Sequence, residues 1–69
     1  MTESQLTVLL VDDHAVVREG YRRLLERSAD IEVVGEAANG SDAYRLADTL
    51  APTVIVMDIS LPEIGRAHV

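Results

Sequence analysis

Several residue types are missing from this 69-residue sequence, which has no cysteine, lysine, phenylalanine or tryptophan and only two tyrosines. Without cysteine there are no disulfides, thiolate metal sites or thiol nucleophiles, and this composition fits a reducing cytoplasm. The longest apolar runs have four residues, as at 8–11, so the sequence predicts no membrane span. The first residues do not form a secretory signal. We therefore expect a cytoplasmic protein without membrane contact.

Basic residues are also scarce, since six arginines stand against twelve acidic residues and the formal net charge is −6. A surface of this charge repels the phosphate backbone of nucleic acids. We therefore expect no direct nucleic-acid binding by this chain. Clustered carboxylates in an acidic chain are instead suited to a divalent cation.

Apolar residues alternate between the spacing of strands and that of helices. The pattern predicts a strand at 7–11 buried on both faces, a helix at 15–27, an edge strand at 31–37, a helix capped by Ser41 and ending before Pro52, and a buried strand at 53–57. Strands that alternate with helices in this way are typical of parallel sheets with right-handed crossovers. The fold class is thus α/β, with the order β-α-β-α-β.

The first predicted helix has two different faces. Val17, Tyr21, Leu24 and Leu25 follow helical spacing and predict a face that packs on the core. The arginines at 18, 22, 23 and 27 form a basic face, which is either a solvated surface paired with acids or a contact surface for a partner kinase. Asp13 is a candidate N-cap of this helix.

Three carboxylates follow the predicted buried strands: Asp12 and Asp13 after the first, and Asp58 after the third. Ligands of open parallel sheets bind outside the carboxyl ends of the strands, where the strand order reverses. If the first strand lies between the other two, these carboxylates converge, and Mg²⁺ would relieve their repulsion. Asp58 could also act as a nucleophile that forms an aspartyl-phosphate. The simpler alternative is that Asp12 and Asp13 only cap the predicted helix at 15–27. His14 is expected to lie in the first turn of that helix and to face solvent.

Four stretches then match a known family in the right order: VLLVDDH at 8–14, REG at 18–20, VVGEAANG at 33–40 and VMDISLP at 56–62. Together they resemble the receiver domain of two-component response regulators. The Asp-Asp-His stretch followed by Arg-x-Gly resembles the subfamily (LuxR/NarL/FixJ-like) in which a helix-turn-helix output domain follows. The resemblance implies a flavodoxin-like, doubly wound sheet with strand order 2-1-3-4-5.

The resemblance also implies roles for individual residues. Asp58 matches the phosphoacceptor, and Asp13 and Asp58 match direct Mg²⁺ ligands, while Asp12 matches the acid that contacts the ion through water. Ser60 matches the position whose main-chain carbonyl binds the metal. Pro62 and Gly65 match the loop before the third helix. The implied partner is a sensor histidine kinase.

Other parts of the family pattern have no counterpart in this sequence. A receiver has five β-α units, and neither the Ser or Thr after strand four nor the Lys after strand five is present. We therefore expect residues 1–65 to be a partial receiver domain and residues 66–69 a tail outside the family pattern. The strand at 53–57 would then be an apolar edge, which predicts a homo-oligomer that pairs through this strand.

Three functions remain open at this point. The favoured one is the phosphoryl-accepting receiver of a DNA-binding transcriptional regulator, which is not an enzyme. A second is a truncated fragment that cannot be phosphorylated and only self-associates. The third is a Mg²⁺-dependent phosphohydrolase with an Asp nucleophile, but such enzymes generally carry a second Asp two residues later, where this chain has Ser60.

Overall fold

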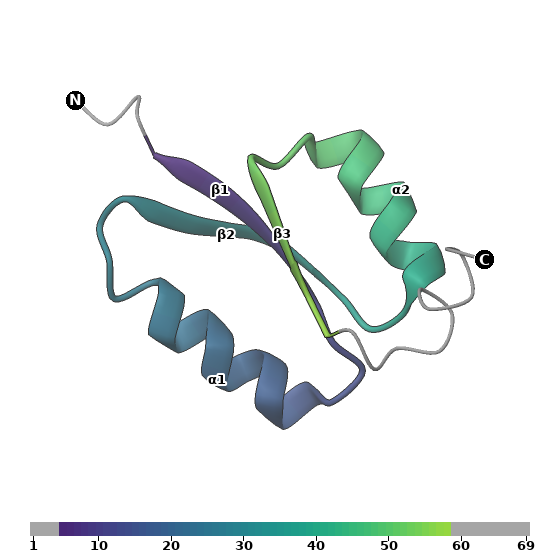
Figure 1. Ribbon diagram of the computed structural model, residues 1–69, viewed down its shortest axis with the longest axis horizontal. Helices are drawn as coiled ribbons and strands as arrows, with labels where there is room; N and C mark the ends of the chain where they lie inside the picture. Colours follow the sequence, from purple (N-terminus) through teal and green to yellow (C-terminus); the bar gives the residue numbers. More distant parts are fainter. Residues whose placement is uncertain (1–4, 59–69) are drawn as a thin grey trace.

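A computed structural model describes residues 5–58 of the chain, and Figure 1 shows its arrangement. The elements are β1 (Leu6–Val11), α1 (Ala15–Leu25), β2 (Ile31–Ala37), α2 (Gly40–Leu50) and β3 (Val54–Met57). The predicted β-α-β-α-β order is confirmed, and each boundary that lies among these residues agrees to within two residues.

The strands form one parallel sheet in the order β2-β1-β3. Both crossovers contain a helix, and the two helices lie on opposite sides of the sheet (Figure 1). The order agrees with the first three strands of the receiver arrangement, and β2 is an edge strand as predicted. Because β1 is central, its carboxyl end lies between those of its two neighbours.

The core is centred on β1, as its apolar run predicts. Val8–Val11 is buried on both faces of the sheet, with Leu9 fully inaccessible to solvent. Leu9 and Val11 pack with Ala37 and Ala43 between the sheet and α2. Burial of these side chains supplies the main apolar contribution to folding.

A register shift in β2 places Gly35 beside Leu50, the last residue of α2. Val8 is aligned with Val33 but Leu9 with Gly35, so one residue of β2 is looped out between them. A Cβ atom on Gly35 would lie 2.7 Å from a methyl carbon of Leu50. Gly35 therefore leaves room for the side chain of Leu50 above β2.

Two apolar surfaces are less buried than their sequence patterns alone indicate, among the residues that the structure describes. On α1, Val17, Tyr21 and Leu24 are 44–58% exposed, and the helix has no fully buried residue. On β3, Ile55 and Met57 are also about two-fifths exposed. Like β2, this strand is at an edge, as expected for a partial receiver, and it pairs only with β1 among residues 5–58.

The helix caps differ from those predicted. Asn39, not Ser41, is the N-cap of α2, and its side-chain oxygen accepts a hydrogen bond of 2.8 Å from the amide of Asp42. His14, not Asp13, occupies the N-cap position of α1, and its side chain makes no capping bond. Asp13 thereby lies outside the helix, in the segment that follows β1.

Each of the two helices has eleven residues, and neither could cross a membrane.

Candidate functional site

Hydrogen bonds just beyond the strand ends place two of the acidic residues side by side. The amide of Asp12 donates to the carbonyl of Ala37 at 3.0 Å, which continues the pairing of β1 with β2. The amide of Asp58 donates to the carbonyl of Val11 at 2.9 Å, which continues the pairing of β1 with β3. The parallel register therefore brings Asp58 beside the residue that follows Val11, namely Asp12.

The structure brings together the three carboxylates that the sequence singled out. Single donor atoms of Asp12, Asp13, His14 and Asp58 all lie within 4.8 Å of one another. Asp12 is buried, Asp58 is partly buried, and Asp13 and His14 are exposed. Ser60 lies outside the described residues.

His14 is closer to the acids than its sequence position suggested. Its imidazole ring is 64% exposed, in agreement with the expected solvent-facing position. However, the Nδ1 atom lies 2.9 Å from Oδ1 of Asp13 and 3.2 Å from Oδ1 of Asp12. The only sign of this contact in the sequence was that His14 directly follows Asp12 and Asp13.

Asp12 is held through both its main chain and its side chain. Its Oδ1 atom accepts a hydrogen bond of 2.8 Å from the amide of His14. Its main-chain carbonyl accepts one of 2.7 Å from Nη1 of Arg18. With the bond to Ala37, these contacts fix the orientation of a buried carboxylate at the carboxyl end of β1.

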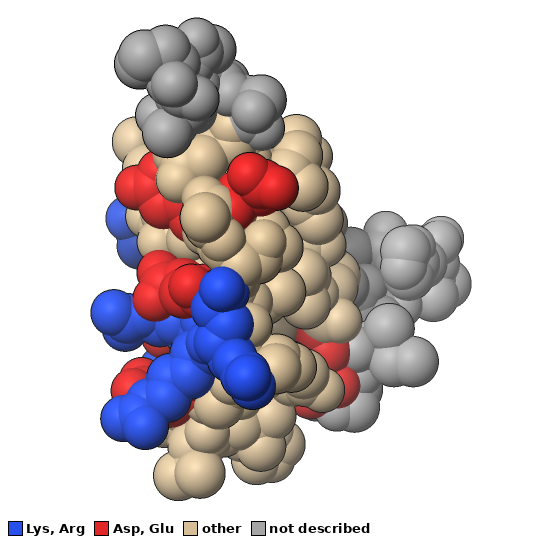
Figure 2. All heavy atoms as spheres, turned by 90° about the vertical axis from the view of Figure 1, so that its left-hand side faces the viewer, with Lys and Arg blue, Asp and Glu red and all other residues tan. Residues whose placement is uncertain are grey.

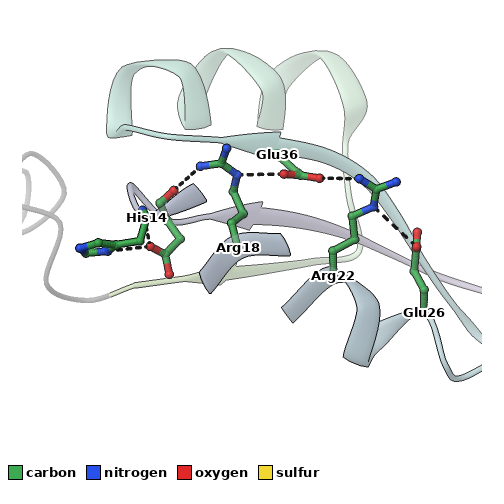
Figure 3. A network of polar contacts seen from close by, with 6 residues as sticks. His14, Arg18, Arg22, Glu26 and Glu36 are labelled. Atoms are coloured by element: carbon green, nitrogen blue, oxygen red, sulfur yellow. Dashed lines mark hydrogen bonds and ion pairs between the residues drawn. The ribbon is translucent and has the colours of Figure 1, made fainter. Parts of the chain in front are cut away.

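The arginines of α1 pair with acids, which was one of the two predicted alternatives, but they form two groups instead of a single face. Arg18 and Arg22 both reach Glu36 of β2, at 2.8 Å and 3.2 Å (Figure 3). Arg23 instead pairs with Glu19 on the exposed side of the helix, at 3.3 Å. Figure 2 shows these positive groups interspersed with acids on one side of the molecule. Arg22 also lies 3.6 Å from Glu26, one turn further along the chain.

Next to the carboxylates, a hollow of about 310 Å³ separates α1 from β1 and β3. Asp12, His14 and Asp58 line it, together with less polar residues such as Tyr21 and Val56. The acids therefore border a solvent-accessible space, so a small ion or group could reach them without rearrangement of the strands.

The donor atoms suit a hard divalent cation. Three carboxylates close together repel one another, and an ion such as Mg²⁺ removes that repulsion while it takes oxygen ligands and keeps some of its water. The partly exposed position of the cluster leaves room for those waters. The residues present therefore fit the ion that the family resemblance implies.

Residues 8–65 match the family model described as the response regulator receiver domain, which confirms the resemblance. This chain belongs to that family. It is 53% identical over 58 residues to the transcriptional regulatory protein YdfI of Bacillus subtilis, a match that covers 84% of this chain and 27% of YdfI. It is 53% identical over 60 residues to the response regulator UvrY of Escherichia coli strain K12, covering 87% and 28%. The nitrate/nitrite response regulator NarL of the same strain is 45% identical over 56 residues, covering 81% and 26%.

Solved structures give the same assignment. A LuxR-family two-component response regulator from an Aurantimonas species superposes with a TM-score of 0.81 at 52% identity, over 86% of this chain and 42% of that one. The receiver domain of a NarL-type regulator from Mycobacterium tuberculosis also gives 0.81, at 37% identity, over 86% and 48%. The chain thus has the receiver fold of LuxR/NarL-type regulators, and it spans about a quarter of the length of its curated relatives.

Proposed function

We propose that Asp58 accepts a phosphoryl group in a Mg²⁺-dependent reaction, as the signal-receiving step of a two-component system. The observation that carries this proposal is the approach of the Asp12, Asp13 and Asp58 donor atoms to within 4.8 Å at the carboxyl ends of β1 and β3. A metal site with a partly buried carboxylate beside it is the arrangement that phosphoryl transfer to an aspartate requires.

Asp13 and Asp58 would bind Mg²⁺ directly, Asp12 would contact it through water, and the main-chain carbonyl of Ser60 is the further ligand proposed from the family. When bound, the ion neutralises charge on the transferring phosphoryl oxygens. Arg18 keeps the segment after β1 in place, and the hydrogen bond from Asp58 to Val11 fixes the acceptor relative to it.

The proposed reaction moves a phosphoryl group from a histidine of the kinase to Asp58. A carboxylate oxygen of Asp58 bonds to the phosphorus of a phosphohistidine on a sensor kinase while the P–N bond breaks. The electron pair of that bond returns to the imidazole of the kinase, and the product is a mixed anhydride on Asp58. Acetyl phosphate can replace the kinase, with acetate as the leaving group.

The experiment is to incubate the chain with acetyl phosphate and measure its intact mass, with Mg²⁺ and with EDTA. We expect the added mass of one phosphoryl group only with Mg²⁺, and none in Asp58→Asn. Asp48→Asn, which removes an exposed acid of α2, is the matched control and should behave as the unchanged chain. Modification that persists in Asp58→Asn would refute the assignment.

We propose a cytoplasmic DNA-binding transcriptional regulator as the whole protein, because the relatives include a transcriptional regulatory protein and a LuxR-family regulator. Its sensor histidine kinase would be the phosphoryl donor. The relatives are response regulators, which are generally not enzymes, and this favours the receiver over the phosphohydrolase alternative.

We also propose that this chain forms a homo-oligomer through β3. Val54, Ile55 and Met57 are 38–41% exposed on a strand that pairs only with β1 among the described residues. A second copy paired along this strand would satisfy its main-chain groups and cover its apolar side chains. The alternative of a fragment that only self-associates would show this assembly without modification of Asp58.

A further inference from the structure

Arg18 differs from most other residues of α1 in its burial. Its side chain is only 19% exposed, and Leu25 is the only other residue of this helix that is partly buried. Its two contacts lie on different elements, at the end of β1 and in β2. An arginine in this position holds two parts of the structure together, which a solvated surface arginine does not do.

The guanidinium group of Arg18 connects the segment after β1, which contains Asp12 and Asp13, to β2. Nη1 donates to the main-chain carbonyl of Asp12 at 2.7 Å, and Nε donates to Oε1 of Glu36 at 2.8 Å (Figure 3). Glu36 is aligned with Leu10 in the β1–β2 ladder, so its position is fixed by the sheet. Its other carboxylate oxygen accepts a hydrogen bond from Arg22 at 3.2 Å.

We propose that Arg18 is a positioning residue for the carboxylate cluster, an inference that rests on the proposed metal site. The carbonyl of Asp12 and the amide of Asp13 belong to one planar peptide group, so a bond that fixes the carbonyl also fixes the start of Asp13. Arg18 thereby sets the direction of two acids that repel each other and would otherwise move apart. Glu36 keeps the guanidinium in the required orientation.

The charge of Arg18 alone would have the opposite effect on a metal ion. A nearby cation repels Mg²⁺ and weakens binding, whereas an ordered ligand set strengthens it. The ion-pair network contains two positive and two negative side chains, so its net charge is zero. These are Arg18, Arg22, Glu26 and Glu36. The positional effect is therefore the one that remains.

The test is the dissociation constant of Mg²⁺, measured by calorimetry at a temperature where every variant is folded. Contacts of this kind change metal affinity by about 10- to 100-fold. We expect Arg18→Met and Arg18→Lys both to weaken binding about tenfold, since lysine keeps the charge but lacks the planar fork that reaches both partners. Glu36→Gln should act in the same direction. Arg23→Met, which removes an exposed ion pair of the same helix, should leave the affinity unchanged.

Hydrogen exchange gives a second readout that does not depend on metal. The amide of His14 donates to the carboxylate of Asp12, so its exchange rate reports directly on the position of that side chain. In metal-free protein we expect Arg18→Met to accelerate exchange at His14 by about tenfold, while Leu9 in the core keeps its rate.

Each outcome decides a different claim. If Arg18→Met binds Mg²⁺ as tightly as the unchanged chain, or more tightly, and exchange at His14 is unaltered, the positioning role is refuted. If the unchanged chain does not bind Mg²⁺ at all, the proposed function is wrong, and the exchange rate of His14 still decides whether Arg18 orders the segment.

Discussion

The amide of Asp58 donates a hydrogen bond of 2.9 Å to the main-chain carbonyl of Val11, the residue directly before Asp12. This bond joins the end of β3 to the end of β1, although 47 positions separate the two residues in the sequence. The distance between the acids of the two strands is therefore set by the spacing of strands in a sheet. The local conformation of either loop has less influence on it.

The first prediction concerns Mg²⁺. If the three carboxylates bind this ion, millimolar Mg²⁺ should raise the melting temperature, because an ion that binds only the folded state stabilises it by RT ln(1 + [L]/Kd). We expect a gain below the ~2.7 kcal/mol reached at one hundred times Kd, as the ligands are partly exposed. Asp13→Asn should remove most of this gain. An equal gain in Asp13→Asn would show that the ion binds elsewhere.

The second prediction concerns repulsion within the cluster. In metal-free buffer, Asp58→Asn or Asp13→Asn should raise the stability by about 1 kcal/mol, the energy of two unit charges about 4 Å apart in water-like surroundings. Thermal unfolding followed by circular dichroism measures this change. Asp48→Asn on α2 is the control, and it should leave the melting temperature unaltered. A loss of stability in both cluster variants would contradict the account.

The carboxylate cluster also shows how far the sequence could be interpreted. The order of elements followed from apolar spacing. The convergence of Asp12, Asp13 and Asp58 also required a central first strand, which only the family resemblance implied. The roles of Arg18 and Glu36 followed from neither, because both depend on which side of β2 faces α1. That orientation is set by the register of β2 against β1, including the looped-out residue before Gly35.

Burial was predicted less well than topology, for a related reason. A helical stripe such as Val17, Tyr21 and Leu24 indicates a face suited to packing, but the amount of burial depends on what lies opposite it. Among the described residues, a hollow lies beside Val17 and Tyr21 instead of a packed layer. The exposure of β3 was easier to predict, because the missing fourth strand of the family pattern already implied an apolar edge at 53–57.

The third prediction concerns the core. Leu9→Ala should destabilise the fold by about 3 kcal/mol, because Leu9 is fully buried between the sheet and α2 and its loss leaves a cavity. For so short a chain this loss should abolish the cooperative transition in chemical denaturation. Leu24→Ala is the matched control, since Leu24 is 58% exposed and its removal should cost little. Equal effects of the two substitutions would place the core elsewhere.

The fourth prediction concerns self-association through β3. Sedimentation at micromolar concentration should show a dimer or a larger assembly, and Ile55→Asp should unfold the chain as well as separate it, because each copy depends on the other for stability. Val16→Asp is the control, since Val16 is an 85% exposed residue of α1. A compact monomer that melts cooperatively would overturn this part of the account.

The most direct test of the central claim is to locate the phosphoryl group itself. The chain is incubated with acetyl phosphate and Mg²⁺, reduced with borohydride, which converts an aspartyl-phosphate to homoserine, and sequenced by mass spectrometry. We predict homoserine at position 58 in a fraction of the chains, since no lysine is present to assist the transfer. Homoserine at Asp12 or Asp13, or at no aspartate of a chain that binds Mg²⁺, would contradict the account.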